Sequence, residues 1–202
     1  MEFSKLNSSR HKVTQFDGRK VSVDEVKAIL AAATLAPSAH NIQPWHFAIV
    51  DSAEKRAALS TAMHAKNAVQ HESAGATVVV YSDTDLPERV RDMVKIGADF
   101  LPLDHKEDLL IKLPGMFEKF SEQQLSDYLA LNTGLVSQNI VLAANDAGLK
   151  TNIILGFDKA KVKEVLAIEN RFRPELIITM GYSDDAGHAS YRLPVADITD
   201  VL

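Results

Sequence analysis

A short run of polar side chains between two prolines is the densest group of hydrogen-bonding residues in this chain. The segment from Ala36 to Phe47 has the sequence Ala-Pro-Ser-Ala-His-Asn-Ile-Gln-Pro-Trp-His-Phe and holds the only tryptophan. Pro37 and Pro44 interrupt helix and sheet hydrogen bonding, so backbone N–H and C=O groups between them are free to bind something else. Hydroxyl, amide and imidazole groups in such a corner suit recognition of a polar ligand. The alternative is an ordinary turn with its tryptophan in the core.

Two groups of cations, far apart in the sequence, could bind an anion. Arg10, His11 and Lys12 are adjacent, and Arg192 stands in the polar C-terminal segment. A phosphate dianion is held well by the forked guanidinium of arginine, which offers two N–H donors at once. The alternative for the N-terminal cluster is a run of charges in solvent, which is the commoner role of such runs.

Residue types and motifs that are missing exclude several kinds of chemistry. The chain has no cysteine, which excludes disulfides, thiol nucleophiles, zinc–thiolate sites and iron–sulfur clusters. It has no Gly-x-Gly and no Gly-Lys-Ser/Thr, so the usual dinucleotide and P-loop motifs are absent. The seven histidines form no His-x-x-x-His pair, and we expect no metal site. Redox chemistry would therefore need an organic cofactor.

Charge and hydropathy narrow the class of partner. The 22 Lys+Arg and 27 Asp+Glu give a net charge of −5 with both signs interspersed, which disfavours nucleic-acid and anionic-membrane partners. No apolar stretch approaches the ~18 residues of a membrane span, and the N-terminus lacks an apolar signal core, so we expect a cytoplasmic protein. With 202 residues and 46% apolar side chains, residues 1–202 fit one domain.

Capping boxes predict where the main helices begin, and proline or glycine predicts where they end. One helix is expected from Ser22 to Pro37, so the polar corner follows its C-terminal end. The longest is expected from Ser121 to Gly148; at about 40 Å it exceeds what the core of such a domain needs. We therefore expect it to run through a subunit interface. Shorter helices are predicted at 51–64, capped by Asp51, and at 159–167.

Apolar, β-branched runs predict a sheet. Strands are expected at 45–50, 76–81 and 175–182, and the run at 76–81 is typical of a central strand buried on both faces. Residues 84–120 show a helical pattern that Pro102 and Pro114 interrupt, and we expect them to form an excursion over the core. Helices and strands mix without strict alternation, which favours an α+β fold.

Five landmarks, in this order, resemble the FMN-dependent nitroreductase family. They cover nearly the whole chain and are Arg10-His11, the segment 36–47, Asn67 with Gln70, Gly156-Phe157-Asp158, and Arg192-Leu193-Pro194. The resemblance implies a nitroreductase-type fold, with a mixed, largely antiparallel sheet flanked by helices. It also implies a homodimer with flavin sites at the interface, the long helix in that interface and the C-terminal tail on the partner subunit.

The resemblance further implies that FMN carries the chemistry, accepting hydride at its N5 atom, and that no side chain is catalytic. NAD(P)H would reduce the flavin transiently, in a ping-pong cycle that ends on a nitroaromatic or quinone. The 84–120 excursion would lie over the active site. Phosphate binding is implied for Arg10, His11 and Arg192; Lys12 would join the phosphate or the ribityl chain, or point outward.

The same resemblance implies which residues surround the flavin ring. Its polar edge would be bound from both subunits, and its other face would lie along a backbone turn. The implied residues are Pro37, Ser38, Ala39 and Asn41 from one subunit, Asn67 and Gln70 from the other, and Ile154, Leu155 and Gly156 along the opposite face. Gln43, Pro44 and Trp45 are expected to keep the corner rigid.

Two positions depart from the family's pattern. Well-known members place a lysine near the pyrimidine edge, and residues 66–71 hold no clear equivalent. Relatives often carry an acidic residue where Leu155 stands. Gly156 also fits a structural turn, with Asp158 capping the next helix. The departures leave open a flavin-binding protein without turnover, such as a flavin store or sensor, and FMN-dependent chemistry on a different substrate.

Overall fold

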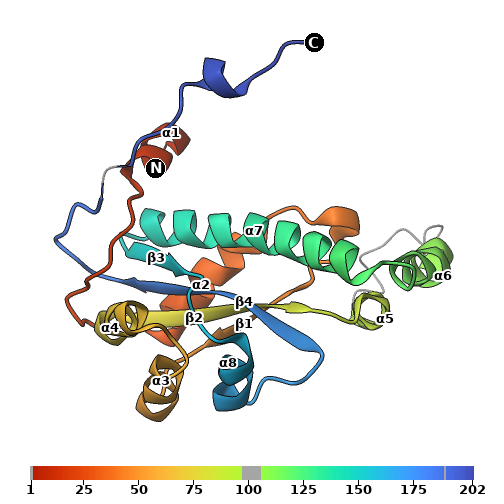
Figure 1. Ribbon diagram of the computed structural model, residues 1–202, viewed down its shortest axis with the longest axis horizontal. Coiled ribbons are helices and arrows are strands. Elements are labelled where there is room, and N and C mark those ends of the chain that lie inside the picture. Colours follow the sequence, from red (N-terminus) through yellow and green to blue (C-terminus); the bar gives the residue numbers. More distant parts are fainter. Residues whose placement is uncertain (1, 97–105, 189) are drawn as a thin grey trace.

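The computed structural model describes residues 2–96, 106–188 and 190–202 and shows a sheet with helices on both faces (Figure 1). The strands are β1 Trp45–Ile49, β2 Ala76–Asp83, β3 Lys150–Ile154 and β4 Phe172–Gly181. The helices are α1 Phe3–Ser9, α2 Val23–Ala33, α3 Ala53–Ser60, α4 Ala65–Ser73, α5 Leu86–Ile96, α6 Lys106–Phe117, α7 Glu122–Asp146 and α8 Lys159–Leu166.

The sheet has the strand order β1-β2-β4-β3, and every neighbouring pair is antiparallel. An isolated parallel bridge from Lys12 to Thr151 adds to the β3 edge. The predicted α+β fold with a largely antiparallel sheet is therefore confirmed. So is the central position of β2, because Val78, Val79 and Val80 are fully buried.

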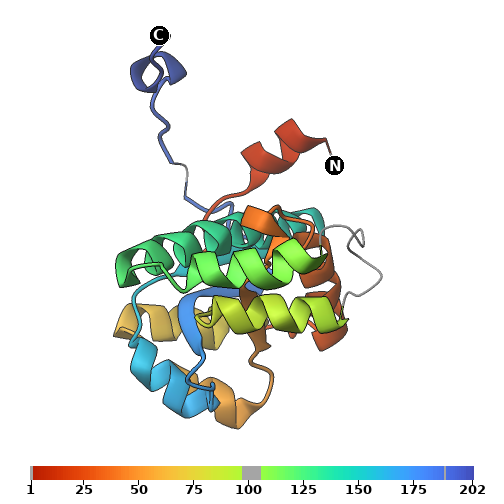
Figure 2. The ribbon, with the colours of Figure 1, turned by 90° about the vertical axis from the view of Figure 1, so that its right-hand side faces the viewer.

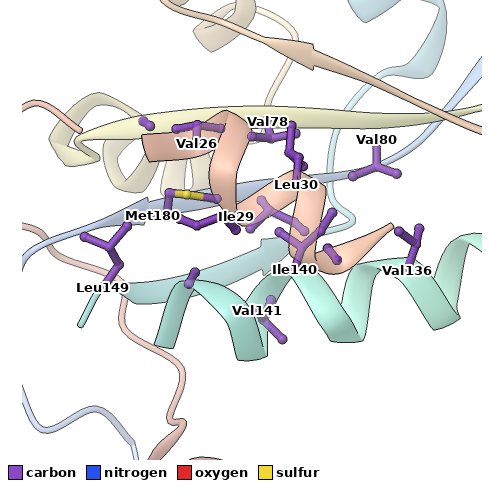
Figure 3. Close-up of a cluster of buried hydrophobic side chains, with 14 of the residues drawn as sticks. Val26, Ile29, Leu30, Val78, Val80, Val136, Ile140, Val141, Leu149 and Met180 are labelled. Atoms are coloured by element: carbon purple, nitrogen blue, oxygen red, sulfur yellow. The ribbon is translucent and has the colours of Figure 1, made fainter. Parts of the chain in front are cut away.

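Alternation along β2 divides the core into two layers. Val78 and Val80 pack with Val26 of α2 and Ile140 of α7 on one face, as Figure 3 shows. Val79 faces the other way and packs against α3 and α8. Successive side chains of a strand point to opposite faces, so this one β-branched run supplies both layers. A third cluster joins α5 and α6 to the first turns of α7.

The two capping boxes form as predicted. Ser22 pairs with Glu25 at the start of α2, and Ser121 with Gln124 at the start of α7. At the other end of α7, Gly148 has φ +82° and the Leu149 N–H bonds the Ala144 carbonyl at 2.9 Å, a Schellman-type ending. α7 is 25 residues long.

Three boundary predictions were wrong in detail. The cap of α3 is Ser52 rather than Asp51, because the Ser52 hydroxyl accepts the Lys55 N–H at 3.2 Å. The predicted helix over 51–64 is shorter, and a separate helix, α4, follows it. Pro114 lies inside α6 instead of interrupting it. It stands near the C-terminal end of the helix, where the missing N–H costs a single hydrogen bond. Pro102 lies outside the described residues.

The two ends of the chain lie on the same side of the molecule, and the tail leaves its body (Figure 2). α1 is attached by Asn145 of α7, whose Nδ2 donates to the Leu6 carbonyl at 3.1 Å. The tail starts beside the N-terminal segment, where the His188 N–H bonds the Lys12 carbonyl at 3.2 Å. Beyond it, large apolar side chains are exposed, including Tyr191 at 80% and Val195 at 73%. No helix within the described ranges is both long and apolar enough to cross a membrane.

His71 of α4 is fully buried against the sheet. Its Nε2 lies 3.0 Å from the Arg56 carbonyl and its Nδ1 lies 2.8 Å from the Thr77 hydroxyl. A carbonyl only accepts, so the neutral ring donates from Nε2 and accepts at Nδ1. Burial lowers the pKa of His71 from its ordinary 6.5, and burial lowers the pKa of His46 in the same way.

The stability of the fold should therefore fall as pH drops below about 6.5, because the unfolded chain binds protons that the folded histidines exclude. The measurement is the free energy of unfolding in urea between about pH 7.5 and pH 5.5. His71→Gln keeps a donor and an acceptor but cannot titrate, so its stability should depend less steeply on pH. A variant with the wild-type slope would contradict this assignment.

Candidate functional site

The polar corner has an unusual backbone. His40, Asn41 and Gln43 have φ of 56°, 54° and 47°, which is the left-handed region. Each such non-glycine residue costs about 1–3 kcal/mol and persists only where the surroundings hold it. Three of the four residues from 40 to 43 adopt this conformation, so contacts with other parts of the protein must hold the corner in place. Its first part is a 3₁₀ turn, Ala39–Asn41.

Helix α7 holds the corner at Ala39. The Ala39 N–H donates to Asn132 Oδ1 at 2.9 Å, and Tyr128 Oη donates to the Ala39 carbonyl at 2.8 Å. Asn132 Nδ2 in turn bonds the Tyr128 carbonyl at 2.7 Å. Burial raises the pKa of Tyr128 to about 12, so its hydroxyl remains a donor. Both backbone polar groups of Ala39 are thus occupied, and its contribution to a ligand is shape.

Further hydrogen bonds close the corner on itself. Ser38 Oγ accepts the Gln43 N–H at 2.9 Å, and Gln43 Nε2 donates to Asn41 Oδ1 at 3.2 Å. These bonds leave the Ser38 O–H and the Asn41 amide N–H groups available as donors. Trp45 is 5% exposed and packs in the core, which is the scaffold position expected of it.

Helix α5 holds the corner from the other side. Arg89 Nη2 donates to the Gln43 carbonyl at 2.8 Å, and Arg89 Nε donates to the Ile42 carbonyl at 3.2 Å. Burial lowers the pKa of this arginine from its usual value. Arg89 could not be recognised from the sequence, because nothing in its local sequence distinguishes it from the exposed Arg91 two residues later.

An ion-pair network anchors α5 to the sheet. Asp83, at the end of β2, is fully buried, and its two carboxylate oxygens accept from Arg171 Nε and Nη2 at 2.7 and 2.5 Å. Arg171 Nη2 also reaches Asp92 of α5 at 2.9 Å. The Asp83 carboxylate raises the pKa of Arg171. Asp92 lies one helical turn beyond Arg89, so this network fixes the helix that carries Arg89.

A second group of predicted residues meets at β3. Asn67 Nδ2 donates to the Gly156 carbonyl at 2.9 Å, and the His64 N–H approaches the same oxygen at 3.3 Å. A Cβ on Gly156 would lie 2.7 Å from His64 Cδ2 and 2.8 Å from Asn67 Nδ2, so any larger residue would have to displace these two side chains. Asp158 caps α8, accepting the Lys161 N–H at 3.0 Å. Gly156 is therefore both a structural turn and the contact of Asn67.

Gln70 and Lys12 both lie beside strand β3. Gln70 Oε1 accepts from Asn152 Nδ2, and the segment after Lys12 pairs with β3 through the Val13 N–H and the Thr151 carbonyl at 3.1 Å. Beside Gln70 is a cavity of about 380 Å³, lined by Thr14, Gln15, Lys66, Val69, Gln70 and Ser73. Lys66 thus brings a cation to this cavity, although the sequence showed no equivalent of the family lysine.

The remaining predicted residues are placed unevenly. Leu155 is 71% exposed beside Gly156, but the Ile154 side chain is buried in the core at 2%, which leaves only its backbone for a ligand. Arg10 follows α1 and is half-buried. Arg192 lies in the tail and donates to the Ser190 and Tyr191 carbonyls at 3.3 and 3.0 Å. Among the residues that the structure describes, no hydrogen bond joins Arg192 to the N-terminal cluster.

The two groups lie on opposite edges of the sheet. The corner (residues 37–43) precedes β1, and the second group (residues 10–12, 67, 70 and 154–156) surrounds β3, while β1 and β3 are the outer strands. Three strand spacings, about 14 Å, separate those strands. One chain therefore presents two incomplete sites.

The chemistry of the two groups is complementary. The corner (residues 37–43) offers neutral donors and a rigid apolar surface, which suit a flat ring with a polar edge. The second group adds amide groups and nearby cations, which suit an anionic end. Within residues 2–96, 106–188 and 190–202, no three histidine or carboxylate residues gather as metal ligands would.

Removal of the buried carboxylate should loosen the α5 anchor. In Asp83→Asn the guanidinium of Arg171 keeps only one carboxylate partner, and breaking such a pair from one side costs about 3 kcal/mol. Urea unfolding would measure the loss. The exposed pair Lys20–Asp51, 2.9 Å apart, provides the control: Asp51→Asn should change stability by less than about 1 kcal/mol. Equal losses in both variants would contradict the role given to Asp83.

Comparisons with known proteins agree with the geometry. The family model described as "Nitroreductase family" matches residues 8–182. Spy0809 of Streptococcus pyogenes, whose assigned name is that of an NAD(P)H nitroreductase, is 44% identical over 200 residues, covering 99% of each chain. A nitroreductase family protein from Streptococcus pneumoniae superposes with TM-score 0.94 at 46% identity, covering 100% of both chains. A protein of Exiguobacterium sibiricum, solved in complex with FMN, superposes with TM-score 0.93 at 30% identity, covering 100% of this chain and 98% of the other.

Proposed function

The chain belongs to the nitroreductase family, and from this premise we propose that it is an FMN-dependent NAD(P)H oxidoreductase. When bound, FMN supplies the hydride acceptor and passes electrons from NAD(P)H to an electron-poor acceptor such as a nitroaromatic or a quinone. The residues of the protein bind FMN and orient it toward NAD(P)H and the acceptor. No side chain needs to act as an acid or a base.

The observation that carries the proposal is the rigid corner. Its strained backbone is held by α5 and α7, while Ser38 and Asn41 keep free donors. A strained, externally supported backbone is typical of a binding site, where preorganisation reduces the cost of binding. The FMN-bound relative of 30% identity supports flavin as the ligand. Ser38 and Asn41 would bind the polar edge of the ring, with Pro37 and Ala39 beside it.

The second group would complete the site. Asn67 and Gln70 would reach the ring edge, and the exposed backbone at Leu155 and Gly156 would lie along its other face. Arg10, His11 and Lys12 would hold the phosphate, joined by Arg192 from the tail. Guanidinium and ammonium donors fit a phosphate dianion, so the donor set agrees with FMN.

A homodimer would bring the two groups together. The corner (residues 37–43) and the second group (residues 10–12, 67, 70 and 154–156) lie on opposite edges of one chain, so a second copy can unite them. Leu131 and Leu135 of α7 are 65% and 39% exposed, and the tail exposes further apolar side chains. Exposed apolar side chains that lie together on a protein surface mark an interaction site. α7 and the tail would therefore bury these side chains against the partner.

The proposal is tested by the flavin itself. The purified protein, mixed with FMN, should bind it, and the visible flavin band should bleach when NADH or NADPH is added without oxygen. Failure to bind FMN would refute the proposal. Binding without bleaching by either donor would favour a flavin store or sensor, and an acceptor screen after reduction would distinguish nitro or quinone reduction from other chemistry.

A mixed dimer tests whether each site uses two subunits. Arg10→Ala damages the second group and Asn41→Ala damages the corner, so each homodimer should bind FMN weakly. In a heterodimer with one variant in each subunit, one site would carry both defects and the other neither. Purified through two tags, it should therefore bind one tight FMN per dimer. No tight site would mean that both groups serve the same subunit's flavin.

A further inference from the structure

We propose that Arg89 is a positioning residue for the flavin: by holding the Ile42 and Gln43 carbonyls, it fixes the corner that binds the ring and so sets flavin affinity and potential. This inference rests on the proposed function. Arg89 does not itself touch the ligand in this assignment. It acts through the backbone of Gln43.

The geometry of the fork supports this role. The Ile42 and Gln43 carbonyls belong to the two peptide groups on either side of Gln43 Cα. Arg89 Nε donates to the first at 3.2 Å and Arg89 Nη2 donates to the second at 2.8 Å. Gln43 is one of the three corner residues with positive φ. Holding both peptide planes fixes the φ and ψ of a residue whose conformation is intrinsically unfavourable.

Gln43 passes this constraint to the residues that would meet the flavin. Its N–H bonds Ser38 Oγ at 2.9 Å and its side chain bonds Asn41 Oδ1 at 3.2 Å. The orientation of the Ser38 hydroxyl and of the Asn41 amide therefore depends on where Gln43 lies. If Gln43 relaxes toward an ordinary conformation, both donors move away from the ring edge.

The placement of Arg89 also sets it apart from ordinary surface arginines. Its charge is partly buried, which costs free energy unless its N–H groups find acceptors. Asp83, Asp92 and Arg171 interact with it electrostatically, and the Asp92–Arg171 bond anchors its own helix at 2.9 Å. Arg91, two residues along α5, is exposed and forms an ion pair with Glu88 of its own helix at 2.6 Å.

Two substitutions separate charge from geometry. Arg89→Lys keeps a positive charge but has one nitrogen and cannot bind both carbonyls as a fork. Arg89→Met removes charge and donors while keeping a long side chain. Arg91→Met, on the same helix, is the matched control. The measurements are the FMN dissociation constant, the flavin midpoint potential, the visible spectrum of bound flavin and the melting temperature.

Both Arg89 variants should bind oxidised FMN roughly tenfold more weakly, because the corner must be ordered on binding. Loss of aligned donors should weaken the preference for reduced over oxidised flavin as well. A tenfold loss of that preference lowers the potential of a two-electron couple by about 30 mV. Arg91→Met should match the wild type in affinity, potential and spectrum.

The outcomes separate this inference from the proposed function. A wild-type protein that binds no FMN would refute the function itself. Wild-type binding with unchanged affinity and potential in both Arg89 variants would refute only the positioning role. A lower melting temperature without a change of potential or spectrum would show a purely structural arginine. If Arg89→Met does not fold, Arg89→Lys decides, and equal effects from Arg91→Met would overturn the assignment.

Discussion

The left-handed backbone at His40, Asn41 and Gln43 is the constraint on which the candidate site depends. Three non-glycine residues in that conformation store several kcal/mol, which the corner alone cannot recover. The compensation comes from hydrogen bonds offered by Asn132 and Tyr128 of α7 and by Arg89 of α5. The corner is therefore a property of three elements that are distant in sequence, and its geometry is only as firm as their packing.

The two helices that hold the corner are attached to the sheet by different kinds of interaction. The long helix is fixed by the apolar layer that it shares with α2 and β2 (Figure 3). α5 has a smaller apolar face and relies in addition on Asp83, Arg171 and Asp92. One support is thus non-directional and hydrophobic, and the other is directional and ionic. α7 holds the corner at Ala39 and α5 holds it at Ile42 and Gln43, so together they fix both ends of the same short segment.

Much of the fold could be predicted from the sequence, because its signals are local. Capping boxes at Ser22 and Ser121 and the β-branched run before Tyr81 located α2, α7 and β2. The supports of the corner could not be predicted, because Arg89 and Arg171 have ordinary neighbours in sequence and gain their partners only in three dimensions. Asn132 did carry a signal: a polar residue on the buried face of a helix, one turn beyond Tyr128, needs an internal acceptor or donor.

The way Ala39 is bound has an evolutionary consequence. Its N–H and carbonyl are both occupied by α7, while its side chain and that of His40 are exposed. Substitution at these two positions changes the shape and polarity of the surface without removing any bond that supports the frame. Lineages can thus drift toward new small-molecule preferences here while the main-chain scaffold stays constant. Selection for substrate choice and selection for foldability therefore act on separate atoms of the same short segment.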